Sequence, residues 1–425
     1  MSLAVRPPRA AVTPQALGSQ GPGSPAPASQ GLGSQAQVRV MVCDDSVAIR
    51  GAIVRMLETD PAIRVVARAA HGQAAVDELA RTQVDVLVLD VEMPVLDGLA
   101  ALPLLLRADP DLRVIMASTL TTRGADVAMR ALRLGAADYV PKPSSIGVAG
   151  DDTFRRELIE KVKGLARLRR RAAAATLDRA AAANLDRAGA ANLDRAGAAN
   201  GDRTAAATSG RPAPAPARSP SPVLRLQPAA SLPARLLAIG SSTGGPQALF
   251  TLVQGLGDTL SVPVVLTQHM PRTFTPILAE HITKLHGLPC AEATHGEVLR
   301  AGRIYLAPGD RHLLVERVAG GLQARLSDDP PENFCRPSVD PMLRSAATAC
   351  DGRVLVAMLT GMGHDGLAGT RQVIDAGGTA VAQDEATSVV WGMPGAVAQA
   401  GLCHAVLPLP EIAMKLRTLL GRPRA

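Results

Sequence analysis

Ser242 lies in a stretch that could present a nucleophile. Residues 236–245 read LLAIGSSTGG, in which four apolar residues run into a turn of glycines and small hydroxyl residues. A buried parallel strand delivers a reactive group to its carboxyl end in this way. Gly240 and Gly244 flank Ser242 in the G-x-S-x-G spacing of a nucleophile elbow, where glycine permits a tight turn that pushes the hydroxyl outward. The pattern by itself is equally consistent with an ordinary glycine-rich turn between a strand and a helix.

Two later strands end in residues that could activate this serine. The segment VPVVLTQHM brings His269 to a strand end, and RVLVAMLTGMG leads to His364 and Asp365. Adjacent parallel strands bring their carboxyl ends together, so an imidazole could take the serine proton and an aspartate could hold the imidazole tautomer. Taken singly, His269 is consistent with a hydrogen-bonded strand-end histidine and Asp365 with a helix N-cap. Three strand ends that supply Ser, His and Asp together favour a catalytic triad.

Alternative interpretations of the second half of the chain remain open at this point. The glycine-rich turn could bind a nucleotide, although the strand after it ends in Gln268 and His269, where an acidic ribose ligand would be expected. The order Ser, His, Asp differs from the Ser, Asp, His order of the α/β-hydrolases, so the turn does not assign that fold. His364 stands beside Asp365 and would compete as the base if the loop turned differently.

A second group of chemically competent residues lies in the first half of the chain. Asp44 and Asp45 end one predicted strand and Asp90 ends another, at the edge where an open α/β sheet binds ligands. Three crowded carboxylates repel one another and require a cation, and Mg²⁺ suits a few carboxylates together with phosphate oxygens. Ser118 and Lys142 follow later strands and offer a hydroxyl and a positive charge to an anion formed on Asp90.

Two α/β domains are predicted to position these residues. Five strand and helix units over 38–165 predict a flavodoxin-like, five-stranded parallel domain, and 231–425 predicts a doubly wound parallel α/β domain. Aromatic residues make up only 2% of the chain and apolar residues 47%, which is typical of Ala, Val and Leu packing on parallel sheets. We predict a disordered tail over 1–37 and a low-complexity linker over 166–230, whose repeats read TLDRAAAA, NLDRAGAA, NLDRAGAA and NGDRTAAA.

Composition excludes several classes of protein. The five cysteines are odd in number and lack C-x-x-C spacing, which argues against a disulfide framework and a zinc site. No apolar run approaches the ~18 residues that span a membrane, so we expect a soluble, cytoplasmic protein without membrane insertion, and a monomer. The predicted linker holds eleven arginines and four aspartates and so carries the whole net charge of +7. Because no aromatic residues interleave with these arginines, we expect no nucleic-acid partner.

The first predicted domain resembles the receiver domain of bacterial two-component response regulators. The matching motifs are Asp44-Asp45, LVLDVEMPVLDG around Asp90, Ser118, and DYVPKP with Tyr139 and Lys142. The resemblance implies that Asp90 is the phospho-acceptor. It also implies that Asp45, Asp90 and the backbone carbonyl of Glu92 hold Mg²⁺, with Asp44 assisting through water.

The same resemblance implies how phosphorylation is produced and sensed. A chemotaxis histidine kinase would be the phosphodonor. Lys142 and Ser118 would engage the phosphoryl group, and Ser118 and Tyr139 would be the switch pair that repacks in response.

The second predicted domain resembles the catalytic domain of the CheB family of chemotaxis protein-glutamate methylesterases. The matching motifs are AIGSSTGGPQAL, TQHMPRTFT, IYLAPGDRH, RPSVDPM, LTGMGHDG and AQDEATSVVWGMP. The resemblance implies that Ser242 is the nucleophile, His269 the base and Asp365 its orienting partner. It places Thr243 and Met362 near an oxyanion hole made of backbone donors.

The implied activity is that of a phosphorylation-activated serine esterase acting in chemotaxis. It would hydrolyse glutamyl methyl esters of methyl-accepting chemoreceptors and deamidate receptor glutamines, with no cofactor for the esterase reaction. We expect the receiver domain to shield Ser242 until Asp90 is phosphorylated. The alternative function is a phosphorylation-controlled module that binds receptors without hydrolysis. A DNA-binding response regulator is not expected, because an α/β domain stands where a helix-turn-helix would follow.

Overall fold

The computed structural model describes residues 37–142, 154–174, 224–257, 260–286 and 288–421. Nearly all of the predicted tail over 1–37, and the octapeptide repeats of the predicted linker, lie outside the described residues. Among the helices that the structure describes, none combines the length and the apolar character needed to cross a bilayer.

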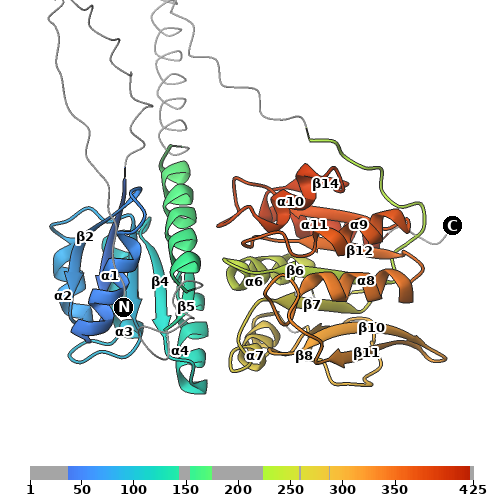
Figure 1. Ribbon diagram of the computed structural model, residues 1–425, viewed down its shortest axis with the longest axis horizontal. Coiled ribbons are helices and arrows are strands. Elements are labelled where there is room, and N and C mark those ends of the chain that lie inside the picture. Colours follow the sequence, from blue (N-terminus) through green and yellow to red (C-terminus); the bar gives the residue numbers. More distant parts are fainter. Residues whose placement is uncertain (1–36, 143–153, 175–223, 258–259, 287, 422–425) are drawn as a thin grey trace, which may run out of the picture. The chain divides into compact units, whose positions relative to one another are not determined.

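The first half of the chain forms a five-stranded sheet with the order β2-β1-β3-β4-β5, in which every pair is parallel (Figure 1). The strands are β1 (Val38–Cys43), β2 (Ile63–Ala69), β3 (Val86–Asp90), β4 (Arg113–Ser118) and β5 (Asp138–Pro141). The helices between them are α1 (Val47–Leu57), α2 (Gly72–Leu79), α3 (Gly98–Ala108) and α4 (Thr122–Arg133), and residues 154–174 are also helical. The predicted five-stranded parallel domain is confirmed.

Alternation along β1 explains why helices cover both faces of this sheet. Val40 and Val42 pack in the cluster that contains α1 and the helical residues 154–174, whereas Met41 and Cys43 pack in the cluster that contains α2 and α3. Both sets of side chains are buried, so the strand is apolar on both faces apart from Arg39, which is half-buried and pairs with Asp85.

The second half of the chain forms a seven-stranded sheet with the order β14-β13-β12-β6-β7-β9-β8, again with every pair parallel. The strands are β6 (Leu236–Ser241), β7 (Val264–Gln268), β8 (Cys290–Glu292), β9 (Ile304–Leu306), β12 (Val354–Met358), β13 (Thr379–Gln383) and β14 (Ala405–Leu407). The chain builds outward from β6 through β7 to β8 and β9, and later through β12 to β14 on the other side. The strand order therefore reverses beside β6, at the point where doubly wound sheets bind ligands.

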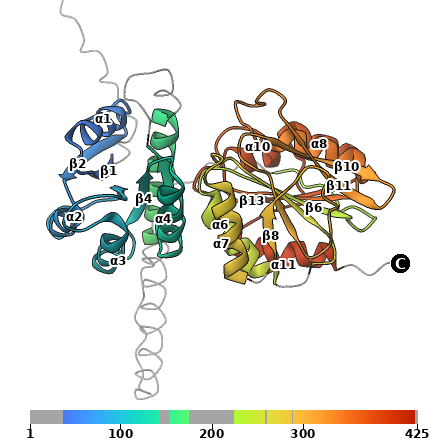
Figure 2. The same ribbon diagram turned by 90° about the horizontal axis from the view of Figure 1, so that it is seen from below.

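Helices cover both faces of the second sheet, as predicted. Apolar side chains of one face pack with α6 (Gly245–Leu256), α7 (Thr275–His286) and α11 (Leu409–Leu420). Those of the other face pack with α8 (Val339–Ala349), α9 (Leu367–Asp375) and α10 (Met393–Gln399). Figure 2 shows α6, α7 and α11 on one side of the strands and α8 and α10 on the other.

The structure adds an antiparallel hairpin that is absent from the sequence prediction. It consists of β10 (His312–Val318) and β11 (Gly321–Ser327), which pair only with each other among the named strands. Buried residues alternate with half-buried ones along β11, and β10 contacts α8. The hairpin precedes the segment that leads into α8, and that segment lies beside the candidate active site.

The described residues extend into both ends of the predicted linker. The helix that began at 154 continues to 174 because Ala166 and Leu168 pack against the first sheet's core. At the other end, Gln227 N donates to Cys403 O at 2.8 Å and Ala230 N donates to Thr379 Oγ1 at 2.8 Å. These contacts attach residues before 231 to the second domain.

Candidate active site and phosphorylation site

Ser242 follows the central strand of the second sheet. β12 pairs with one edge of β6 and β7 with the other, so three neighbouring strands lead to Asp365, Ser242 and His269. The turn after β6 needs glycine, since Gly244 has φ +73° and a Cβ there would lie 2.4 Å from Val389 Cγ2. Helix α6 then begins at Gly245, which gives the tight connection that the sequence predicts.

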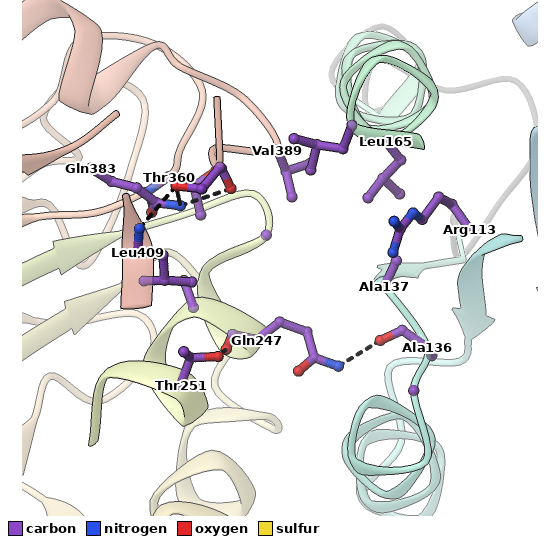
Figure 3. A pocket seen from close by; sticks show the side chains of 15 residues that line it. Arg113, Ala136, Ala137, Leu165, Gln247, Thr251, Thr360, Gln383, Val389 and Leu409 are labelled. Carbon is purple, nitrogen blue, oxygen red and sulfur yellow. Dashed lines mark hydrogen bonds between the residues drawn. The ribbon is translucent and has the colours of Figure 1, made fainter. Parts of the chain in front are cut away.

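Two buried glutamines fix the turn that carries Ser242. Gln268 Nε2 donates to Ser242 O at 2.9 Å, and Gln268 Oε1 accepts from Ser241 Oγ at 2.7 Å. On the other side, Ser242 N donates to Thr360 O at 3.0 Å, and Thr360 N donates to Gln383 Oε1 at 2.8 Å. Thr360 and Gln383 are drawn in Figure 3. The sequence predicts no role for Gln383, and Gln268 serves there only as evidence against nucleotide binding, although both are polar residues that end apolar strands.

His269 and Asp365 form a close pair. His269 Nε2 lies 2.8 Å from Asp365 Oδ2, and their side chains are only 12% and 3% exposed. An ionised carboxylate can only accept, so Nε2 carries the proton and donates it to Asp365. This leaves Nδ1 of His269 to face the rest of the site.

Asp365 is surrounded by hydrogen-bond donors. Besides His269, the donors are Asn333 Nδ2 at 2.9 Å, Ser338 Oγ at 2.8 Å, Val339 N at 2.6 Å, Asp340 N at 3.1 Å and Gly366 N at 2.8 Å. Burial favours the neutral acid, but the bond from His269, with those from Val339 and Ser338, outweighs it and holds the pKa of Asp365 well below its usual range. Val339 and Asp340 also open α8, whose positive end favours the carboxylate.

Nδ1 of His269 contacts the thiol of Cys335, for which the sequence predicts no role. Cys335 Sγ lies 3.4 Å from this nitrogen. Across the part of the chain that the structure describes, no hydrogen bond joins Ser242 Oγ to His269. Burial lowers the pKa of His269, but the contacts with Asp365 and Cys335 raise it to about 10.

The loop after β12 lies against Ser242. A Cβ on Gly361 would come within 2.9 Å of Ser242 Cβ, so the backbone next to Met362 passes directly over the serine. Thr243 is buried, and its carbonyl accepts from Thr360 Oγ1 at 2.9 Å. His364 is exposed, whereas Asp365 is buried. The exposed position of His364 argues against its acting in place of His269.

The acidic residues of the first domain also come together. Oxygens of Asp44, Asp45 and Asp90 lie within 4.8 Å of one another. Lys142 Nζ contacts Asp44 Oδ2 at 2.8 Å and Asp90 Oδ1 at 2.7 Å. A cavity of about 320 Å³ opens beside them, and its lining consists of Asp45, Asp90, Val91, Glu92, Thr119 and Lys142. This set of hard oxygen donors is typical of a Mg²⁺ site and fits that ion.

Burial and ion pairing act in opposite directions on the pKa values of Asp90 and Lys142. Burial raises the pKa of Asp90 above its usual value, although Lys142 acts in the opposite direction. Burial also lowers the pKa of Lys142, but its contacts with Asp44 and Asp90 outweigh this and raise it. A cationic lysine thus stays beside the carboxylate that would carry a phosphoryl group.

Ser118 and Tyr139 lie on neighbouring strands. Ser118 is buried, and its Oγ donates to Thr119 O at 3.3 Å. Lys142 N donates to Ser118 O at 2.6 Å, so both residues reach the same sheet edge as Asp90. Tyr139 is buried, with Lys161 Nζ 5.1 Å from its ring centroid.

Comparison with known proteins decides the family. Residues 40–148 match the response regulator receiver domain, and residues 237–416 match the CheB methylesterase domain. The protein-glutamate methylesterase/protein-glutamine glutaminase of Azospirillum brasilense is 51% identical over 409 residues, which cover 94% of this chain and 98% of that protein. The chain belongs to the CheB methylesterase family.

A second relative agrees with this assignment, and part of the chain is also similar to a solved structure. A protein-glutamate methylesterase/protein-glutamine glutaminase of Rhodospirillum centenum is 51% identical over 388 residues, covering 91% of this chain and 95% of that protein. The crystal structure of the Thermotoga maritima CheB methylesterase catalytic domain is 38% identical, covers 44% of this chain and all of that chain, and has a TM-score of 0.43. The family resemblance that the sequence motifs indicate is confirmed.

Proposed function

We propose that this protein removes methyl groups from glutamyl methyl esters of methyl-accepting chemoreceptors and deamidates receptor glutamines. The observation that carries the proposal is the 2.8 Å contact between His269 Nε2 and Asp365 Oδ2, two residues that follow the strands on either side of β6. The relatives named above are protein-glutamate methylesterases and protein-glutamine glutaminases, and the chain matches them over nearly its whole length.

In the proposed reaction, Ser242 Oγ attacks the ester carbonyl carbon while His269 takes the serine proton at Nδ1. Nδ1 is the base atom because Nε2 is bound to Asp365. The tetrahedral intermediate collapses, and methanol leaves with the proton from His269. Water then attacks the acyl-enzyme with His269 again as base, which yields the glutamate and restores Ser242. With a glutamine substrate, ammonia leaves in place of methanol.

Asp365 supports both proton transfers by stabilising the imidazolium. Backbone N–H groups near Thr243 and Met362 would bind the oxyanion, and the close passage of Gly361 over Ser242 supports this assignment. Each such donor contributes about 3 kcal/mol to transition-state stabilisation when preorganised. Ser242 Oγ must also reach the position at Nδ1 that Cys335 Sγ holds in this state.

We further propose that phosphorylation of Asp90 by a chemotaxis histidine kinase controls the esterase. The open cavity beside Asp90 and the contact of Lys142 with it support a phosphoryl site. Asp45, Asp90 and the carbonyl of Glu92 would hold Mg²⁺, with Asp44 assisting through water. When bound, Mg²⁺ would supply positive charge to the transferring phosphoryl group. We propose a cytoplasmic location, where the kinase would meet the protein, and no cofactor for the ester hydrolysis.

The test is methanol release from methylated chemoreceptor by the wild-type protein and by Ser242→Ala. We expect the substitution to abolish release while the variant still binds receptor. Release by Ser242→Ala at the wild-type rate would exclude the serine mechanism. If neither protein releases methanol although both bind receptor in a phosphorylation-dependent manner, the alternative of a binding module without hydrolysis is correct.

A further inference from the structure

A tight hairpin turn stands beside the proposed catalytic pair. Glu332 N donates to Cys335 O at 3.1 Å and Cys335 N donates to Glu332 O at 3.0 Å, which leaves a two-residue turn at Asn333 and Phe334. Both turn residues have positive φ, +53° at Asn333 and +63° at Phe334. This is the pattern of a type I′ turn, whose second position favours glycine. Phe334 therefore stands where an aromatic side chain imposes backbone strain.

The turn is fixed on both sides to the groups that would perform catalysis. Asn333 Nδ2 donates to Asp365 Oδ1 at 2.9 Å, and Cys335 Sγ lies 3.4 Å from His269 Nδ1. At the base of the turn, two hydrogen bonds of 2.5 and 2.6 Å join Arg344 to Glu332. The tip of the turn is thus held at a set position relative to His269 and Asp365.

The Phe334 side chain contributes nothing to the core. Its relative exposure is 103%, the highest among the exposed large hydrophobic residues that the structure describes. One exposed apolar residue needs no explanation by itself. A fully exposed aromatic residue in a strained conformation, between two residues that contact the catalytic pair, does need one, because strain persists where function requires it.

We propose that Phe334 is a substrate-specificity residue that docks against an apolar side chain of the receptor protein next to the target glutamyl residue. This inference rests on the proposed function. The relatives act on glutamyl residues of proteins, so the target side chain is attached to a protein surface that can be recognised. An aromatic ring with few rotatable bonds, presented on a rigid turn, is an effective anchor for such a surface. Docking there would hold the target residue beside His269 and Asp365, which the two neighbours of Phe334 contact.

The experiment compares the full-length wild-type protein with Phe334→Gly and Phe334→Tyr on methylated chemoreceptor. Glycine suits the positive φ, so Phe334→Gly should keep or raise Tm while removing the ring. We expect Phe334→Gly to raise KM about tenfold with kcat retained, as loss of an aromatic anchor would, and Phe334→Tyr to restore KM. In a Ser242→Ala background, receptor affinity measured by calorimetry should fall by the same factor when Phe334→Gly is added.

Met414→Ala is the matched control, because Met414 is an exposed apolar residue at 68% on α11 and should leave KM unchanged. An unchanged KM in Phe334→Gly overturns the inference, and so does a fall in kcat and Tm at constant KM, which would mark a structural role. A concentration-dependent dimer that Phe334→Gly abolishes would assign the ring to a second copy of the chain and also overturn it. If the wild-type protein releases no methanol, the proposed function fails instead.

Discussion

Replacing Asp365 by asparagine changes the most densely hydrogen-bonded side chain of the proposed active site. Oδ2 accepts from His269 Nε2 at 2.8 Å and from Val339 N at 2.6 Å. An amide nitrogen at this position would face two donors. The imidazole could adapt by moving its proton to Nδ1 and accepting at Nε2, but Nδ1 would then no longer be a base. Val339 N cannot adapt, because it is a backbone donor.

Turning the amide over does not relieve the mismatch. Oδ1 accepts from the donors Asn333 Nδ2, Ser338 Oγ, Asp340 N and Gly366 N. Ser338 can rotate its hydroxyl and accept, whereas the two backbone N–H groups would lose their acceptor. Each buried donor without an acceptor costs about 1 to 3 kcal/mol. We therefore expect Asp365→Asn to lose at least that much stability and, through the wrong tautomer, about ten-thousandfold in kcat.

The assay combines thermal unfolding with methanol release from methylated chemoreceptor. His364→Ala is the matched control, because this neighbouring side chain is exposed and should change neither Tm nor kcat. If Asp365→Asn keeps more than a tenth of the wild-type kcat, the assignment of Asp365 as the partner of His269 is refuted. A large loss of kcat in His364→Ala would also refute this assignment.

Other substitutions address the thiol, the phosphoryl site and the linker. Cys335→Ala should lower the pKa of His269 from about 10, so the rise of kcat/KM with pH moves to lower pH; an unchanged profile contradicts the thiol contact. Because the pKa of His269 is raised from 6.5 to about 10, its ion pair should stabilise the fold fully below about pH 6.5 and be lost as pH rises towards 10, which urea unfolding can follow. In Lys142→Met, and in the wild-type protein after chelation of Mg²⁺, a phosphodonor should no longer stimulate methanol release, while the basal rate persists. Stimulation equal to that of the untreated wild-type protein in either experiment would contradict the assigned phosphoryl site. Fragment 224–425 should release methanol faster than the unphosphorylated intact protein, and equal rates would contradict control by the receiver domain.

Both sheets could be predicted from local patterns. Runs such as VLVL in β3 and LLAIG in β6 are apolar without interruption, which is typical of strands buried on both faces. The polar residues that end these runs also indicate where the reactive edge of each sheet lies. Parallel order and adjacency then follow from simple chain connections.

The β10–β11 hairpin and the surroundings of Asp365 could not be predicted in the same way. β11 reads GLQARLS, with half-buried polar residues between buried ones, and such a short alternation resembles many loops. Asn333, Cys335 and Ser338 precede Asp365 by about thirty residues, and no sequence spacing links them. They reach the site only because the chain turns tightly at 333–334 before α8.

The adjacency of β6 and β7 does not determine the orientation of the His269 imidazole. Neighbouring strand ends bring Ser242 and His269 into the same region, but the direction of an imidazole depends on side chains from elsewhere in the chain. Here Asp365 takes Nε2 and Cys335 contacts Nδ1. The catalytic roles of Ser242, His269 and Asp365 are predictions that the assays described above test.

Phosphorylation-dependent ester hydrolysis is tested most directly by one measurement. Methanol release from methylated chemoreceptor is followed with the intact protein and with Asp90→Asn, each with and without a phosphodonor and Mg²⁺. We predict that the phosphodonor raises the rate of the wild-type protein and leaves Asp90→Asn at its basal rate. No methanol from the phosphorylated wild-type protein, or equal stimulation of Asp90→Asn, would contradict the proposed function.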